Sequence, residues 1–329
     1  MAKYGRLAFL ALALILAGGC GTSAQAPKKS TLLLNYALAG RHAPFFVGIE
    51  KGYYKEVGLD LQVLPSSGSG FVATAVDGGQ AEFGLIEATA LIQAVAKGAK
   101  IKMFQAFVVD TPNGLASLKP IPDLKSLLTI KIGSPATSST KSIMPVIMDL
   151  NGLDPEKLQW VTANTASLIT LVANGSVDAF GAALDSDVPV LEKILKPQGK
   201  KVFYSPYAKW GYDGLGFLFM AKTSLLSERP QDAKGFASAT AKAVAFSLAN
   251  PDAATDIMVK YNPTLDRETT FIQWGYSIEA IETPYKKQHG FGNVTEDRVL
   301  RSIELTKKAF KLDNDIKPDE VFAKGFTGN

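Results

Sequence analysis

Short apolar runs alternate with amphipathic stretches along the chain from Thr31 onward. A first series of apolar runs predicts strands at 32–37, 61–64, 82–86, 101–109 and 115–118. A second series predicts strands at 129–133, 159–161, 178–183 and 202–204. Strand-like runs that alternate with helical stretches are typical of doubly wound α/β domains. We therefore expect an α/β protein with two such sheets.

The C-terminal third has a different pattern, because one further apolar run at 216–221 is followed by helical periodicity. The periodicity predicts helices at 233–249, 267–281 and 297–310. Between the two series lies Lys119–Asp123, whose two prolines favour an extended connection. The predicted division is a first lobe from 31–117, a second lobe from 118–210, and a return to the first lobe with C-terminal helices from 211–329.

The two series also resemble one another. Gly58-Leu59-Asp60 recurs as Gly152-Leu153-Asp154, and the stretch "GGQAEFGLI" corresponds to the later stretch "NGSVDAFGAA". Each copy places a helix that ends in glycine before an acidic residue and an apolar strand, so both lobes are expected to share one supersecondary plan. Coincidence is the alternative, because glycine and aspartate are common at turns.

The N-terminus has the architecture of a signal peptide. Lys3 and Arg6 precede an apolar run, Leu7 to Ala17, which is too short to span a bilayer as a helix. Gly18-Gly19-Cys20 follows, and Cys20 is the only cysteine. We expect a signal peptide at 1–19. The run from Leu16 to Cys20 resembles a bacterial lipoprotein box, and this resemblance implies a lipidated Cys20 with a flexible tether at 20–30; the alternative is a cysteine that merely ends the apolar run.

Composition excludes some partner classes. With 47% hydrophobic and 20% charged residues, the 329-residue chain has a globular composition. Without Lys3 and Arg6 it carries 33 basic and 31 acidic residues, so no strong field attracts nucleic acid. Common enzyme motifs are missing: there is no Walker A, H-E-x-x-H or G-x-S-x-G sequence. From these features we expect no catalytic residues, no cofactor, no metal and no enzymatic activity.

The stretch "HAPFFVGIEKGYYKEVGLDLQV", which begins at His42, resembles the opening of a known family. The segment "IGSPATSSTKS" resembles the same family. This family comprises the periplasmic binding proteins of ABC importers for aliphatic sulfonates, nitrate, taurine and thiamine precursors. Eukaryotic thiamine-pyrimidine synthases share the fold, but they use a cysteine-rich iron site that Cys20 alone cannot form.

The resemblance implies a two-lobed periplasmic-binding-protein fold of type II, with doubly wound sheets joined by a two-segment hinge. It implies a monomeric substrate-binding lipoprotein in the periplasm or at the outer face of the cell membrane. That protein would capture a small organic solute, anionic or heteroaromatic, and deliver it to an ABC permease and its ATPase. Two alternatives stay open: an extracytoplasmic enzyme on the same scaffold, and a lipoprotein that presents its solute to a receptor.

Ligands of open α/β sheets bind beyond the carboxyl ends of the strands. In the second lobe this rule selects the loop from Ser134 to Thr140, where hydroxyls and free N–H groups precede a helix and could bind an anion. It also selects the glycine- and serine-rich loop at 65–70 and the loop at 162–165. The candidate residues from these three loops are Thr137, Ser138, Ser139, Ser67, Gly68 and Asn164. Ordinary helix capping and bland turns are the alternatives.

Charged and aromatic candidates lie at other strand ends. Arg41 could clamp an anionic head group and His42 could exchange a proton, or Arg41 could be a solvated rim charge. Glu87 and Asp185 follow the third strand of their lobes and could face one another across a cleft, or each could pair with a local lysine. The remaining candidates are aromatic residues that could stack on a ring: Tyr36 and Trp210.

Overall fold

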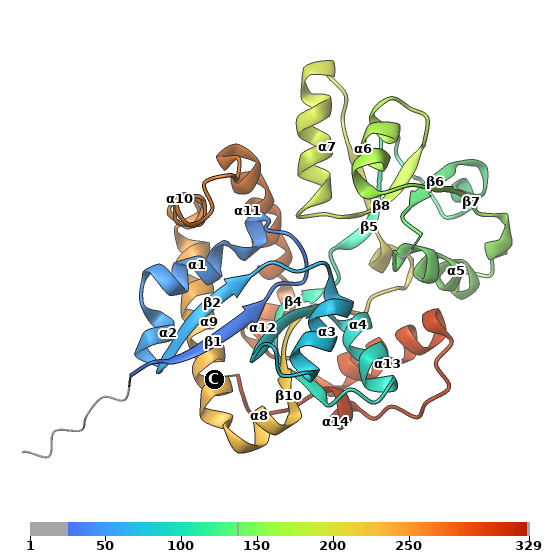
Figure 1. Ribbon diagram of the computed structural model, residues 1–329. Helices are drawn as coiled ribbons and strands as arrows, with labels where there is room; N and C mark the ends of the chain where they lie inside the picture. Colours follow the sequence, from blue (N-terminus) through green and yellow to red (C-terminus); the bar gives the residue numbers. More distant parts are fainter. Residues whose placement is uncertain (1–25, 137, 328–329) are drawn as a thin grey trace, which may run out of the picture.

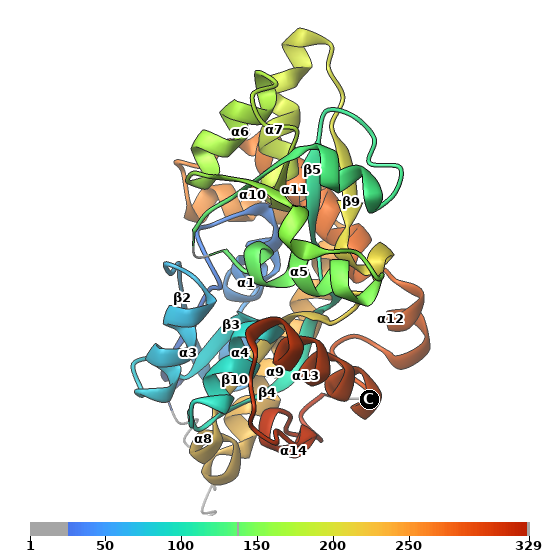
Figure 2. The same cartoon turned by 90° about the vertical axis from the view of Figure 1, so that its right-hand side faces the viewer.

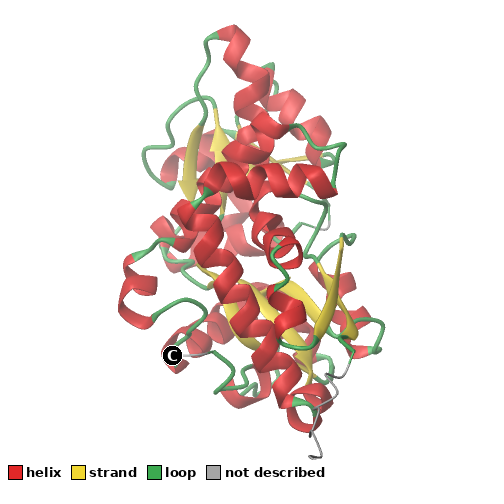
Figure 3. Ribbon diagram, turned by 90° about the vertical axis from the view of Figure 1, so that its left-hand side faces the viewer, coloured by secondary structure: helices red, strands yellow, loops and turns green. Residues whose placement is uncertain are grey.

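The chain folds around two five-stranded sheets, one in each of two lobes (Figure 1). The computed structural model describes residues 26–136 and 138–327. The predicted signal peptide and Cys20 lie outside these described residues. The α/β class is confirmed, because helices cover both sheets (Figure 3).

The first sheet combines parallel and antiparallel strands. β1 runs parallel to β2 and β3, while β10 runs antiparallel to both β3 and β4. In spatial order the strands are β2 (Leu59–Leu64), β1 (Lys28–Leu33), β3 (Phe83–Glu87), β10 (Leu215–Lys222) and β4 (Ile101–Asp110). β10 begins where the chain returns from the second lobe, so it is one of the two strands that link the lobes.

The second sheet has the same plan. β6 runs parallel to β7 and β8, and β5 runs antiparallel to β8 and β9. In spatial order the strands are β7 (Gln159–Thr162), β6 (Lys131–Ser134), β8 (Ala179–Ala183), β5 (Asn113–Ser117) and β9 (Phe203–Pro206). The antiparallel fourth strand of each sheet is therefore supplied by chain that has just crossed from the other lobe.

Helices cover the two sheets and fill the C-terminal third (Figures 1 and 2). The first sheet is covered by η1 (Gly40–His42), α1 (Ala43–Glu50), α2 (Tyr53–Glu56), α3 (Ser69–Asp77) and α4 (Ala88–Ala96). The second lobe contains η2 (Lys125–Thr129), α5 (Thr140–Leu150), η3 (Pro155–Lys157), α6 (Thr165–Ala173), α7 (Asp187–Leu195), η4 (Lys196–Gln198) and η5 (Tyr207–Trp210). The C-terminal helices are α8 (Thr223–Glu228), α9 (Pro230–Ala249), α10 (Pro251–Tyr261), α11 (Arg267–Ile281), α12 (Pro284–His289), α13 (Glu296–Phe310) and α14 (Pro318–Val321).

Two of the predicted boundaries are wrong. The strand expected at 115–118 in the first lobe is β5, which pairs with β8 and β9 of the second sheet. The chain therefore crosses between the lobes at 111–112 rather than after 117. The tether expected at 20–30 also runs too far, because 28–30 already belong to β1 and pair with 59–61. Lys28 and Lys29 are exposed polar residues of that strand, so the apolar pattern did not reveal its start.

The sequence similarity between the two series of predicted strands corresponds to a structural repeat. α3 and α6 begin 96 residues apart, as do β3 and β8. The acidic residue that precedes the repeated strand has the same role in both copies, since it accepts a hydrogen bond from a backbone N–H. Glu82 accepts from the Thr31 N–H, and Asp178 accepts from the Lys131 N–H. Gly79 and Gly175 both have a positive φ, 76° and 79°, where a side chain would be strained.

The first sheet has a separate apolar core on each face, as expected of a doubly wound sheet. Along β1 the side chains alternate, with Leu32 in the core beneath α1 and α9 and Leu33 in the core beneath α3 and α4. Phe236 of α9 is fully buried in the first of these cores. Both faces of the sheet are thus buried, and its strand ends remain for other contacts.

Gly114 of β5 lies where the chain has just entered the second sheet. A Cβ there would lie 2.4 Å from the Ser205 carbonyl oxygen and 2.6 Å from Cζ of Tyr204. Gly114→Ala is expected to reduce the free energy of unfolding by about 1 to 3 kcal/mol, because the backbone of β9 must move. Thermal unfolding followed by circular dichroism measures the loss. The control is Gly70→Ala in α3, where a Cβ meets nothing within 4 Å and helix propensity favours alanine. Equal stabilities of the two variants would contradict the expected clash.

Candidate functional site

A cavity of about 280 Å³ lies between the two lobes, at the carboxyl ends of β1, β3, β6 and β8. Both sheets contribute to its wall, which is where the switch-point rule places ligands. Six of the residues predicted from the sequence line the cavity: Tyr36, Arg41, Gly68, Glu87, Ser138 and Ser139. Their contact with a ligand remains a prediction.

Arg41 forms a buried ion pair that joins the lobes. Its Nη2 lies 3.1 Å from Oδ1 of Asp185, and the two side chains are 5% and 0% exposed. The guanidinium also lies over the ring of Phe217, 4.6 Å from its centroid. On the other side of the pair, Ser277 of α11 donates to Oδ2 of Asp185. Arg41 is therefore not a solvated rim charge, and much of its charge is offset before any solute arrives.

Asp185 does not face Glu87 across the cleft as predicted. It is fully buried against Arg41 and does not line the cavity, whereas Arg41 does. The carboxyl that shares the cavity with Glu87 is Asp187, two residues further on and the first residue of α7. Asn113 donates to Oε1 of Glu87 at 3.1 Å, and the Ala183 N–H donates to Oδ2 of Asp187 at 2.8 Å. Burial raises the pKa of both carboxyls, and these two hydrogen bonds only partly oppose the rise.

His42 is a buried structural group rather than part of the cavity wall. Its Nδ1 accepts the Ala39 N–H at 3.1 Å, so its proton lies on Nε2, which donates to Oδ1 of Asn35 at 3.1 Å. Burial, with the neighbouring charge of Arg41, holds the pKa of His42 well below its usual value, so the ring is neutral. The ring orients Asn35, which does line the cavity and has its amide N–H groups left to donate.

Three other predicted residues lie outside the cavity wall. Trp210 is buried in the apolar core of the second lobe, which also contains Ile143 and Ile147 of α5. Asn164 caps α6 by accepting the Ser167 N–H, and Ser67 is exposed on the loop before α3. Thr137 lies outside the described residues.

Several helices begin at the cavity. Gly68 and Ser69 start α3, Ser139 precedes α5, and Thr165 starts α6. The N-cap of α3 makes no side-chain capping hydrogen bond, so the first N–H groups of that helix remain available to acceptor atoms. The first N–H groups of α5 already donate within the protein, that of Thr140 to the Ser138 hydroxyl and that of Lys141 to the Ser138 carbonyl. Each such terminus carries about half a positive charge, as predicted for the loop before α5.

Several residues of the wall were not singled out as site residues from the sequence, although four of them lie in strand-end loops that the switch-point rule selects: Asn35, Ser69, Asn113, Thr165, Asp187 and Tyr207. Ser69 and Thr165 were recoverable, because they are equivalent positions of the 96-residue repeat at the starts of α3 and α6. Asn113 starts β5 and ends the loop at 110–113, which the switch-point rule also selects, but nothing in the sequence distinguished it from its neighbours in that loop.

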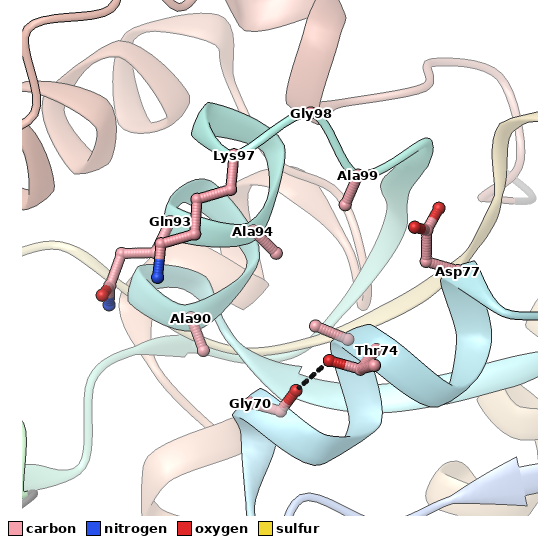
Figure 4. A pocket seen from close by; sticks show the side chains of 10 residues that line it. Gly70, Thr74, Asp77, Ala90, Gln93, Ala94, Lys97, Gly98 and Ala99 are labelled. Atoms are coloured by element: carbon pink, nitrogen blue, oxygen red, sulfur yellow. Dashed lines mark hydrogen bonds between the residues drawn. The ribbon is translucent and has the colours of Figure 1, made fainter.

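A wider groove of about 390 Å³ lies between α3 and α4 (Figure 4). Small side chains such as Ala73, Ala90 and Ala94 line it, and the Thr74 hydroxyl donates to the Gly70 carbonyl. Among the residues that the structure describes, no buried charged side chain lines this groove. The groove also lies along two helices, whereas the cleft lies at strand ends. We therefore take the cleft as the candidate site.

Within 26–136 and 138–327, no group of three or more histidine, cysteine, aspartate or glutamate side chains could hold a metal ion. The residues present there do not fit an iron centre of the kind that the resemblance to the pyrimidine synthases implies. The same ranges contain no helix that is both long and apolar enough to cross a membrane.

Comparison with known proteins identifies the family. Residues 39–254 match the family described as "NMT1/THI5 like". A similar protein is the 4-amino-5-hydroxymethyl-2-methylpyrimidine phosphate synthase THI5 of Saccharomyces cerevisiae, at 24% identity over 80% of this chain and 82% of the relative. The synthase of the same name from Legionella pneumophila is 23% identical over 72% of this chain and 75% of the relative.

Among solved structures, the periplasmic aliphatic sulphonate binding protein SsuA of Escherichia coli superimposes with a TM-score of 0.68. The match covers 92% of this chain and 94% of that protein at 12% identity, which supports the periplasmic-binding-protein fold alone. The relatives, by contrast, are named as synthases, and this finding contradicts the expectation of a protein without enzymatic activity. The family match covers well over half of the chain, and the chain therefore belongs to the NMT1/THI5-like family.

Proposed function

We propose that this protein captures a small organic solute in the cleft between its lobes and delivers it to the permease and ATPase of an ABC importer. The observation that carries the proposal is the cavity of about 280 Å³ whose wall is shared by both sheets. A solute that contacts both walls binds the closed arrangement more tightly than an open one, so binding shifts the population toward closure.

The interlobe contacts support a hinge motion. At one side, α11 meets α7 through polar contacts, among them Lys193 with Asp266 and Tyr276 with Glu192. At another side, Leu305 of α13 packs into the apolar core that contains Ile143 of α5. Polar contacts are readily replaced by water, whereas exposing the apolar contact is costly. We therefore place the hinge near α13 and the crossings at 111–112 and 207–214, with the opening at α11, where closure also forms the buried Arg41–Asp185 pair.

The family and the fold neighbours point to different solutes. The relatives are named for an aminopyrimidine phosphate, and the E. coli neighbour is named for aliphatic sulphonates. Both classes fit the expectation of an anionic or heteroaromatic solute. We further propose that the protein acts as a monomer outside the cytoplasm, held at the membrane by a lipid on Cys20.

Ligand capture is tested with a thermal-shift panel of sulfonates, carboxylates, nitrate and aminopyrimidines. A compound present at about 100 times its dissociation constant should add about 2.7 kcal/mol to the free energy of unfolding. The control compound is sucrose at equal concentration. If no compound in the panel, and no extract of the growth medium, raises the unfolding temperature, solute capture is contradicted.

A second candidate function is synthesis of a pyrimidine, which the named synthases among the relatives favour. The two candidates differ in what happens to a bound compound. Mass spectrometry of a compound recovered after incubation with the protein distinguishes them, because capture returns it unchanged and synthesis converts it.

A further inference from the structure

Helix α11 is fixed to the first lobe and meets α7 of the second lobe along one face (Figures 1 and 2). Trp274 and Ile281 of α11 are buried in the apolar core beneath α1 and α9. The apolar core that contains Leu191 of α7 shares no residue with it among those that the structure describes. Within the described chain the two helices are thus joined by polar contacts rather than by a shared apolar core.

The inner part of this contact is buried. Gln273 is 8% exposed and connects the lobes through its amide, because Oε1 accepts the Gly40 N–H at 2.8 Å and Nε2 donates to the Ser186 carbonyl at 3.2 Å. One turn further along α11, the Ser277 hydroxyl donates to Oδ2 of Asp185 at 3.1 Å. Dissolved salt screens buried contacts much less than exposed ones. The strength of the inner part should therefore not depend on ionic strength.

The outer part of the contact is ionic and exposed. Nζ of Lys193 lies 2.6 Å from Oδ2 of Asp266 and also donates to the Thr269 hydroxyl at 3.1 Å. Nζ of Lys196 lies 3.5 Å from Oε1 of Glu268. The four charged side chains are between 49% and 79% exposed. Exposed pairs of this kind are weak, and salt screens them, because the Debye length falls from about 30 Å at 0.01 M to about 3 Å at 1 M.

The charges of the outer part are divided between the lobes. Both lysines belong to the second lobe and both carboxylates to the first, so opening the cleft separates each pair. Other exposed pairs lie within one lobe. Lys242 of α9 pairs with Glu56 of α2, and these two helices belong to the first lobe. Lys260 of α10 pairs with Glu50 of α1 in the same lobe. Those two pairs stay together when the cleft opens.

Resting on the proposed closure of the cleft, we propose that the contact between 185–196 and 266–277 is a latch that acts before any solute binds. Its ionic outer part makes the balance between open and closed protein depend on ionic strength. Its buried inner part favours the closed arrangement at every salt concentration. Because a solute that contacts both walls binds the closed arrangement more tightly, the latch also tightens solute binding at low ionic strength.

The test measures the distance between the lobes in dialysed, solute-free protein by double electron–electron resonance. Spin labels are attached at Gln198→Cys of η4 and Glu279→Cys of α11, both exposed positions, in a Cys20→Ser background that leaves no other cysteine. Raising the NaCl concentration from 10 mM to 0.5 M should increase the ratio of open to closed protein about threefold to tenfold, because two weak pairs are screened together.

Variants of the labelled protein assign the salt dependence to the outer part. Lys193→Met/Lys196→Met should be as open at 10 mM NaCl as the labelled parent is at 0.5 M, and its ratio should change less than about twofold with salt. The matched control, Lys242→Met/Lys260→Met, removes the same charge from two pairs within the first lobe and should keep the full rise. Gln273→Leu should be more open than the parent at both salt concentrations and should also keep the rise, because it alters the inner part alone.

The outcomes separate the latch from solute capture. A ratio of open to closed protein that does not change with salt overturns the latch, as does a rise that Lys193→Met/Lys196→Met keeps or that the control loses. If a variant fails to fold, the salt dependence of the labelled parent still decides. Solute capture is tested by the thermal-shift panel, so a failed latch leaves it intact. A compound that raises the unfolding temperature without shortening the distance between the labels contradicts closure, and the latch with it, but not capture.

Discussion

Replacing Arg41 by methionine is expected to lower the free energy of unfolding by about 3 to 5 kcal/mol, because it leaves Asp185 buried without its cation. Asp185 is fully buried, and among the residues that the structure describes the one other side chain that donates a hydrogen bond to its carboxyl is Ser277, at 3.1 Å. A single neutral donor does not replace the lost charge. Methionine can still pack on Phe217, but it loses the cation–π contact that the guanidinium makes 4.6 Å above that ring, so the measured loss includes this contact as well as the ion pair.

Urea unfolding at pH 7 measures this loss, with Arg301→Met as the matched control. Arg301 pairs with Asp213 at 2.9 Å, but the two side chains are 37% and 49% exposed, so its removal should cost at most about 1 kcal/mol. The double variant Arg41→Met/Asp185→Asn should recover much of the stability. Equal losses for Arg41→Met and Arg301→Met would show that the Arg41–Asp185 pair is open to water in solution.

The strands were largely predictable, because apolar runs of three to nine residues mark them whatever their partners. The sheet to which each strand belongs was not predictable in the same way. The run at 115–118 reads the same whichever sheet receives it, and pairing with β8 and β9 is a long-range event that local pattern does not encode. Likewise α10, Pro251–Tyr261, was not predicted, although a proline at its first position indicates a helix start.

The cleft itself was predictable from the switch-point rule, but the roles of individual side chains were not. Asp185 and Asp187 are both acidic and follow the same strand, yet one is buried beside Arg41 and the other lines the cavity. The local turn into α7 decides between them, and two residues of spacing in sequence do not reveal it. Arg41 was likewise predicted either to bind an anionic head group or to be a solvated rim charge, whereas the structure shows it paired with Asp185 of the opposite lobe.

Phe236→Ala is expected to cost about 3 to 5 kcal/mol, through lost burial and a cavity that rigid neighbours cannot close. Phe236 of α9 stacks on Phe83 of β3 at a centroid distance of 4.3 Å and meets Phe219 of β10 edge-on at 5.2 Å. β10 is also a strand that links the lobes, so the loss acts directly on the sheet that supports the cleft. Urea unfolding measures the cost, and hydrogen exchange locates it in β3 and β10.

The matched control is Phe71→Ala, because Phe71 is 49% exposed on α3 and its removal should change stability by less than about 0.5 kcal/mol. Phe236→Leu should cost less than Phe236→Ala, since leucine fills part of the space but cannot stack on Phe83. A loss below about 1.5 kcal/mol for Phe236→Ala would mean that α9 moves inward to fill the cavity. In that case the first sheet is less rigid than its aromatic packing indicates, and exchange in β3 and β10 would stay slow.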